Sequence, residues 1–359
     1  MAAAGFVREI REVTAPPDTS AATTKPGGGS ELHPAAQAMA ARHRPRAWEL
    51  LPWLAAVAFY FALPNHLGFG TELLIVILFA LSLDLALGYA GIVTLGHAAF
   101  FGVGAYTVGM LAKYGVWTEP ITGLFFAAVA AGVVGFLSGL VLLRTAGLTL
   151  LMLTLCTMLL LEEAANLGHE WTGGFDGLAD VPIDPVFGVF EFNPLYLNTQ
   201  YVYALCVLFV GFVIVRTIVY SPFGQSLTGI RENTLRMHSV GAPVNMRLVT
   251  CYTISAAIAG VAGAVWAQAN LYVNLSTLGL DRAATVLIIL ALGGYGRLYG
   301  AFVGAILYMV LSHYLAKAYP TAWQLGLGLL LMAIALFARN GVIGIVEAFL
   351  QRRRGRGAS

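Results

Sequence analysis

Apolar residues fill most of the chain in long runs that short polar connections separate. Each run is close to the roughly 20 residues that a helix needs to cross the hydrocarbon core of a bilayer. The pattern predicts about ten membrane helices, at 48–66, 72–88, 91–112, 120–142, 147–165, 201–219, 248–268, 283–296, 299–316 and 322–339. The composition agrees, because 58% of the residues are hydrophobic and 11% are charged, against about 25% charged residues in a soluble domain. We therefore predict an all-α, polytopic membrane protein.

The basic residues gather on one side of the predicted membrane. When the amino terminus is placed inside, only Lys113, Arg282 and Lys317 fall on the outer side, and the other 17 of the 20 Lys and Arg residues fall on the inner side. Inner segments of membrane proteins carry such an excess of positive charge. The charge pattern therefore predicts that both termini are cytoplasmic.

The two ends of the chain differ in composition from the membrane domain, which we place at 48–345. Residues 1–47 are rich in Ala, Thr, Pro and Gly and have no hydrophobic periodicity, which is typical of disorder. We interpret them as a disordered cytoplasmic leader. Residues 346–359 form a basic cytoplasmic tail.

Two connections are long enough to have structure of their own. The outer loop, 166–200, contains no Lys or Arg. The inner loop, 220–247, has the punctuation of a helix: Ser221 can cap it, Pro222 suits its first position and Gly241 suits a left-handed stop. Gly224 and Gly229 weaken this helix, so the pattern fits one amphipathic helix or two short ones equally well.

Glycines recur at helical spacing inside the apolar runs. Small residues let membrane helices approach closely, and they stand at Gly135, Gly139, Gly260, Gly263, Gly296, Gly300 and Gly304. The stretch GYAGIVTLGHAAFFGVGAYT at 88–107 differs, because its glycines cluster with polar residues where one apolar run meets the next. Non-helical backbone at membrane depth survives where protein covers it or where it lines a cavity. We therefore predict a broken helix that lines or gates a pathway, with candidate residues Gly88, Gly91, Thr94, Gly96, His97 and Tyr106.

Ionisable residues within the apolar runs are functional candidates. Asp84 and His97 are either buried polar side chains bonded to loop backbone or members of the pathway, and the sequence leaves both interpretations open. The three cysteines, Cys156, Cys206 and Cys251, all lie in apolar runs and are interpreted as packing residues.

Catalytic motifs are missing from the sequence. It contains no G-x-x-x-x-G-K-[ST], H-E-x-x-H, C-x-x-C or G-x-S-x-G pattern, so it has no phosphate-binding loop, zinc-protease helix or nucleophile elbow. We predict no catalytic residue, no metal ligand and no nucleic-acid partner. The chain is not expected to be an enzyme.

Four motifs occur in a familiar order. They are LGYAGxxxLGHAAFFGVGAY at 87–106, TGGFDGL at 172–178, SPFGxxLxxIRE at 221–232 and LGGYGRLYGAFVGA at 292–305. Together they make residues 48–345 resemble the larger, LivM-type permease subunit of branched-chain amino acid ABC importers. The resemblance implies a type II ABC importer-like permease of ten helices with an inverted pseudo-repeat, in the bacterial plasma (inner) membrane.

The same resemblance implies partners and site residues. The partners are a second, LivH-type permease of the same fold, a periplasmic binding protein and two ATPase subunits, which would bind the ATP and Mg while this chain binds no cofactor. Residues 221–241 resemble the coupling loop that enters the ATPase, with Arg231, Glu232, Arg236 and Gly241 as its expected coupling residues. This sequence departs from the family at 235–238, which read LRMH instead of small residues. The binding protein is expected to dock at Thr172, Gly173, Gly174 and Asp176.

The substrate and the energy source have alternatives. Branched-chain or other hydrophobic amino acids are what the resemblance implies, whereas relatives for urea, amides or aromatic acids share the same architecture. An ion-coupled secondary transporter is the rival from another class, and Asp84 is the one central carboxylate that could serve it.

Overall fold

The computed structural model describes residues 51–179, 181–185 and 197–318, together with 320, 322–326 and 328–329. The chain divides into two units, Met1–Arg44 and Pro45–Ser359, and all described residues belong to the second. The predicted leader, the predicted tail and most of the predicted helix 322–339 lie outside the described residues.

Nine of the ten predicted membrane helices fall within the described residues, and each is present. They are α3 (Leu51–Ala62), α4 (Leu67–Asp84), α5 (His97–Lys113), α6 (Pro120–Leu142), α7 (Leu148–Leu167), α9 (Leu197–Tyr220), α12 (Val244–Asn270), α13 (Leu280–Gly293) and α14 (Gly300–Ala318). Within the described part, seven helical stretches are long and apolar enough to cross a membrane. Helices α3 and α5 are shorter, with 12 and 17 residues.

Short elements join these helices. A 3-10 turn, η2 (Pro64–His66), precedes α4, and a π-helical turn, η3 (Leu85–Tyr89), ends it. The outer loop contains α8 (His169–Thr172), the 3-10 turn η4 (Gly174–Asp176) and the strand β1 (Leu178–Ala179). After α12 come the strand β2 (Tyr272–Val273) and the 3-10 turn η5 (Leu275–Thr277). The inner loop folds into α10 (Pro222–Glu232) and α11 (Thr234–Ser239).

Glycines move two helix boundaries away from their predicted places. Helix α5 begins at His97, so its predicted start at 91 is wrong: Gly91 takes a φ of 74° and Gly96 occupies the N-cap. Helix α13 ends at Gly293 because Gly294 has a φ of 93°. Apolar residues continue through both places, so hydrophobicity alone does not show at which residue each helix begins or ends.

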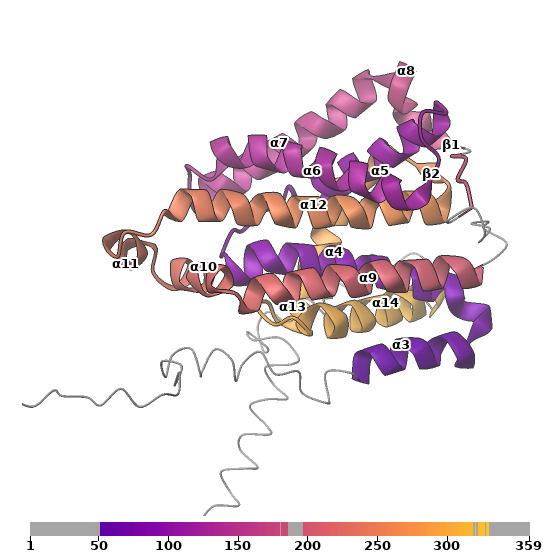
Figure 1. Ribbon diagram of the computed structural model, residues 1–359. Helices are drawn as coiled ribbons and strands as arrows, with labels where there is room; N and C mark the ends of the chain where they lie inside the picture. Colours follow the sequence, from indigo (N-terminus) through magenta and orange to yellow (C-terminus); the bar gives the residue numbers. More distant parts are fainter. Residues whose placement is uncertain are drawn as a thin grey trace, which may run out of the picture. The chain divides into compact units, whose positions relative to one another are not determined.

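Helices α4 and α12 form the centre of the bundle. Helix α12 packs along α5 and α6, while α4 packs along α9 and α12, and α13 packs along α14. Figure 1 shows α5, α6 and α7 on one side of α12, with α4, α9, α13 and α14 on the other. Within the apolar stretch of each span, 83% of the residues are buried in the α4 span, whereas 17% are buried in α7. Helix α7 therefore lies at the edge and presents an apolar face outward.

The helices of the centre touch through their backbones. A methyl group at Gly263 would collide with the Phe101 carbonyl of α5, and one at Gly260 would meet Ala131 of α6. Gly304 approaches the Ile289 carbonyl of α13 in the same way. These contacts confirm the predicted role of small residues. For Gly296 that prediction is wrong, because this residue lies in a loop with a φ of 77°.

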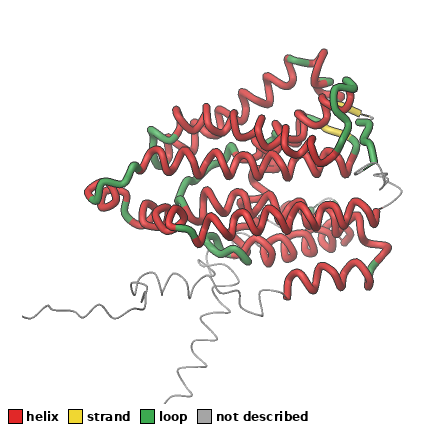
Figure 2. The backbone as a smooth tube through the Cα atoms, in the orientation of Figure 1, coloured by secondary structure: helices red, strands yellow, loops and turns green. Residues whose placement is uncertain are grey.

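The short elements mark two opposite ends of the bundle. Helices α10 and α11 lie together at one end, and α8 and the strands lie at the other (Figures 1 and 2). The strands pair antiparallel, with Leu178 opposite Val273 and Ala179 opposite Tyr272. We call these the α10 end and the ribbon end.

Candidate coupling and pathway site

The inner loop forms two capped helices rather than one. The Ser221 hydroxyl accepts a hydrogen bond from the Gly224 amide at 3.3 Å and caps α10. The Asn233 side chain accepts one from the Arg236 amide at 2.9 Å and caps α11. Gly241, with a φ of 84°, follows α11. We call α10 and α11 the coupling hairpin, and its two-helix form decides an alternative that the sequence left open.

The Ser221 cap carries a testable stability effect. Replacement of Ser221 by alanine is expected to lower the free energy of unfolding by about 1 kcal/mol, because it leaves helix-terminal N–H groups without an acceptor. Thermal unfolding in detergent measures the change. Ser226→Ala is the matched control, since its hydroxyl only donates to the Phe223 carbonyl within the same helix. Equal unfolding temperatures for the two variants would contradict the capping role.

The coupling hairpin has a buried face and an exposed face. Leu227 and Ile230 are buried against the bundle. Arg231, Glu232 and Arg236 are exposed, and so are two large apolar side chains, Leu235 at 78% and Val240 at 77%. Leu235 and Val240 are therefore candidates for contact with a protein partner.

The membrane helices are interrupted at two places near this hairpin. The first break, residues 85–96, joins α4 to α5, and the second break, residues 294–299, joins α13 to α14. The carbonyls of the first break have irregular partners: Ala86 accepts from the Ile92 amide at 2.9 Å, and Leu85 accepts from the Ala90 amide at 3.4 Å and from the Cys251 thiol at 3.5 Å. The predicted broken helix is confirmed.

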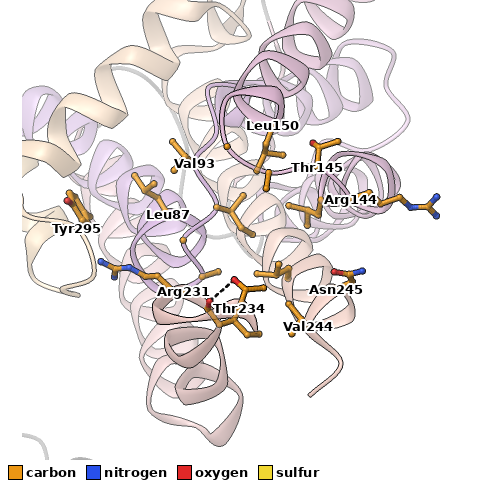
Figure 3. Close-up of a pocket in the computed structure, with 18 residues that line it drawn as sticks. Leu87, Val93, Arg144, Thr145, Leu150, Arg231, Thr234, Val244, Asn245 and Tyr295 are labelled. Atoms are coloured by element: carbon orange, nitrogen blue, oxygen red, sulfur yellow. Dashed lines mark hydrogen bonds between the residues drawn. The ribbon is translucent and has the colours of Figure 1, made fainter. Parts of the chain in front are cut away.

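A cavity of about 710 Å³ opens between the first break and the coupling hairpin. Its wall comes from five segments: Leu87, Ala90, Gly91, Ile92 and Val93 of the first break, Leu143–Gly147 and Leu150 of the α6–α7 turn, Ile230, Arg231 and Thr234 of the hairpin, Val244, Asn245 and Leu248 of α12, and Tyr295 of the second break. Figure 3 shows Leu87, Val93 and Leu150 near one another, while the Arg144 guanidinium points away from them. The cavity therefore has a largely apolar wall.

Arg231 and Asp84 connect the parts of this site. The Arg231 guanidinium donates to the Gly88 carbonyl and lies 5.7 Å from the centre of the Tyr295 ring. Asp84, which is 1% exposed, accepts a hydrogen bond from the Gly296 amide at 2.7 Å. A carboxylate at membrane depth costs about 2.5–3.5 kcal/mol on insertion scales, and the hydrogen bond and the nearby cation offset part of that cost. Asp84 is thus bonded to loop backbone.

His97 is also a buried polar residue with a structural partner. It is 1% exposed, its Nε2 lies 2.9 Å from the Ser82 hydroxyl, and its ring stacks on Phe79 at 5.6 Å. The Ser255 hydroxyl donates to the Ser82 carbonyl at 2.6 Å. His97 therefore ties the start of α5 to α4 and, through Ser82, to α12, and it does not line the cavity.

Comparison with known proteins agrees with this architecture. The model of the branched-chain amino acid transport system / permease component family matches residues 66–336. The chain belongs to this permease family. No solved structure matches the chain in the same comparison.

Individual relatives of the permease come from bacteria and archaea. The high-affinity branched-chain amino acid transport system permease protein LivM of Escherichia coli is 28% identical over 79% of this chain and 71% of its own length. The probable LivM of Methanocaldococcus jannaschii is 24% identical over 74% of this chain and 89% of its own length. The autoinducer 2 import system permease protein LsrC of an Enterobacter species is 28% identical, covering 77% and 81%.

The structure separates the predicted pathway residues of this permease. Gly91 lines the cavity, and Gly88 lies beside it, where a methyl group would collide with Asp84 and the Gly296 amide. Thr94 is buried and accepts a hydrogen bond from the Gly96 amide at 3.1 Å. Gly96 packs against the Thr154 carbonyl of α7. Tyr106 lies in a separate apolar cluster with β1 and β2, toward the ribbon end.

The predicted docking residues of the outer loop lie at the ribbon end, far from the coupling hairpin. Gly173 and Gly174 have φ values of 75° and 55°, and the Thr172 hydroxyl donates to the Gly168 carbonyl at 3.0 Å. The Asp176 carbonyl accepts a hydrogen bond from the Tyr272 hydroxyl at 3.1 Å. These contacts form a fixed turn that leaves Phe175 83% exposed.

The sequence did not predict two contacts of the site. They are the hydrogen bond between Asp84 and the Gly296 amide and the stacking of Arg231 on the Tyr295 ring. A weak signal was present, because LALG occurs at 85–88, where the first break begins, and again at 290–293, just before the second break. Four common residues recur easily by chance, so the repeat did not identify a contact. Among the described residues, no three His, Cys, Asp or Glu side chains lie together as metal ligands.

Proposed function

We propose that this chain is one membrane subunit of an ATP-driven importer, and that the coupling hairpin receives the movement of partner ATPase subunits. The observation that carries the proposal is the hairpin itself: two capped helices at one end of the bundle that expose Leu235 and Val240 and adjoin a break in the membrane helices. A hairpin in this position can pass a partner's movement to the pathway.

The energy source is assigned to other subunits. The sequence has no phosphate-binding loop, so ATP and Mg would bind to two separate ATPase chains that contact the hairpin through Glu232, Arg236 and Gly241. The groove on the ATPase would then have to be wide enough for the large side chains of Leu235, Arg236, Met237 and His238, where the family usually has small residues. A second, LivH-type permease of the same fold would complete the membrane pair, along the apolar face of α7.

The basic residues set the proposed orientation. With the α10 end in the cytoplasm, Arg231, Arg236, Arg247 and Arg297 lie inside, as the positive-inside rule requires. Both termini are then cytoplasmic in the bacterial plasma membrane, with the leader 1–47 and the tail 346–359 at that surface. The proposed fold is the ten-helix inverted repeat, with 322–339 as its tenth helix.

The proposed transport cycle alternates access to a path between the two permeases. A periplasmic binding protein delivers solute at the ribbon end, over Thr172, Gly173, Gly174 and Asp176. The cavity beside the first break is the inward mouth of the path, where a small solute leaves. Its apolar wall suits hydrophobic amino acids, and we propose leucine, isoleucine and valine as the first substrates to test. The printed names of the relatives, which include an autoinducer 2 permease, make a wider panel necessary.

Uptake measurements test the proposal. Cells that express the chain with its partner subunits are given radiolabelled leucine, urea, acetamide or benzoate, either after ATP depletion or after collapse of the ion gradients. Uptake of one solute is expected to stop on ATP depletion and to persist without ion gradients while ATP is maintained. The opposite result would reject an ATP-driven importer and favour an ion-coupled carrier that uses Asp84.

A further inference from the structure

Arg231 lies on the coupling hairpin, yet its side chain turns toward the bundle. One guanidinium nitrogen donates to the Gly88 carbonyl, and the group stacks over the Tyr295 ring at 5.7 Å. Figure 3 shows the side chain extending toward Tyr295, apart from Thr234. Arg231 is an exposed residue, as Glu232 and Arg236 are, but its guanidinium reaches the loops that interrupt the membrane helices.

The two partners of Arg231 belong to the two different breaks. Gly88 lies in the π-helical turn of the first break, and Tyr295 lies in the second break, between two glycines with φ values of 93° and 77°. The guanidinium thus touches both interruptions of the membrane helices from a single position. Its planar, rigid group can serve a carbonyl and an aromatic ring at once, which a lysine ammonium does less well.

The two breaks are also bonded to each other. The Asp84 carboxylate, at the end of α4, accepts the Gly296 amide at 2.7 Å. There is no slack at this contact, since a methyl group at Gly88 would overlap both the carboxylate and that amide. Arg231 would likewise meet a methyl group at Gly296 or at Gly91. Movement of one break must therefore displace the other.

The surroundings explain how a small movement at this place spreads. The α4 span is the most buried one among the described helices, and it packs along α9, α12 and α14. A π-helical turn and a glycine loop are the places where such helices bend, because their backbone hydrogen bonds are already irregular. Force applied at Gly88 and Tyr295 acts on these places directly.

We infer that Arg231 is the positioning residue that joins the coupling hairpin to both breaks, so that one displacement of α10 rearranges residues 84–91 and 294–297 together. This inference rests on the proposed function, since it takes the displacement of α10 from the partner ATPases. It assigns the Arg231 guanidinium to contacts within the permease, and it leaves the partner contact to the residues of α11.

The test uses the whole complex of permeases and ATPases in proteoliposomes, with Arg231→Gln, Arg231→Lys and the control Arg216→Gln. Arg216 also stacks on a tyrosine, at 5.6 Å, but on Tyr220 of its own helix. We expect Arg231→Gln to keep its ATPase partners and to hydrolyse ATP, while solute moved per ATP falls about tenfold or more, as the loss of a charge-assisted hydrogen bond implies. Arg231→Lys should be intermediate, and Arg216→Gln should match the native complex.

A second measurement follows the break itself. Val93, which lines the cavity and is 45% exposed, is replaced by cysteine after exchange of the exposed Cys156 and Cys206 for serine. Maleimide labelling at this position should change when the ATPases are trapped with vanadate, and Arg231→Gln should remove that change. Tyr295→Leu, at a 48% exposed position, provides a second variant that should weaken the response in the same direction.

The outcomes distinguish the inference from the proposed function. The inference would be overturned if Arg231→Gln moved as much solute per ATP as the native complex. It would also be overturned if vanadate changed the labelling of position 93 equally in Arg231→Gln and in the native complex. Loss of the ATPase partners from Arg231→Gln alone would also overturn it, because Arg231 would then be a partner contact. If the native complex itself binds no ATPase and transports without ATP, the proposed function fails instead.

Discussion

Replacement of Gly263 by alanine is expected to destabilise the folded protein by at least about 3 kcal/mol, the upper part of the range for overpacked cores. The added methyl group would occupy the place of the Phe101 carbonyl oxygen. Both groups belong to the backbone contact between α12 and α5, and neither can rotate away. Folded proteins have only about 5–15 kcal/mol of stability, so the yield of folded protein in the membrane should fall sharply.

Gly132→Ala is the matched control for this experiment. Its methyl group would meet Ala257 at 3.6 Å, an ordinary contact, and alanine gains about 0.8–1 kcal/mol over glycine in helix propensity. Thermal unfolding in detergent and the yield of monodisperse protein measure both variants. A Gly263→Ala variant as stable as Gly132→Ala would show that α12 and α5 are not in backbone contact.

Replacement of Leu235 by aspartate should have the largest effect on transport. The side chain is 78% exposed, and exposed substitutions usually change stability by less than about 0.5 kcal/mol, so the permease should fold normally. A charge in the proposed apolar contact should cost about 2 kcal/mol or more of partner binding, the size of an interface hot spot. Copurification of the ATPases and ATP-dependent uptake should therefore both fall at least about tenfold.

Leu235→Met is the control, because methionine keeps an apolar side chain of similar volume. Uptake by this variant should stay close to native, and the unfolding temperatures of both variants should agree with that of the native chain. ATPase binding and uptake that are native in Leu235→Asp would remove the coupling hairpin from the partner contact and place that contact elsewhere.

The sequence was most informative where a local rule decides the structure. The residues Ser221, Pro222 and Gly241 marked the beginning and end of the coupling hairpin, because caps and left-handed stops depend on neighbours in the chain. Boundaries were lost where an apolar run continues through a break. The cluster of Gly91 and Gly96 predicted a break, but it did not show that the next helix begins only at His97, since hydrophobicity records the solvent and not the backbone angles.

Contacts between distant segments were beyond the sequence. Asp84 stood out as a carboxylate among apolar residues, but its partner, the Gly296 amide, is 212 residues away and is a backbone group that every residue except proline offers. Gly296 was assigned to helix packing from its spacing, whereas its φ of 77° places it in a loop. Spacing shows which residues share a helix face, and it cannot show where the helix ends.

The sequence by itself determined that the chain crosses a membrane, approximately where its helices run, and that two connections have structure of their own. These properties follow from transfer free energies and local capping, which each segment carries alone. Only the tertiary structure decided that the Arg231 guanidinium contacts both breaks, that Asp84 joins two breaks and that His97 serves packing. Those facts depend on which surfaces meet when the helices pack. A side chain that bonds to a distant backbone carbonyl or amide cannot be matched to its partner from the sequence, because almost every residue has these backbone groups.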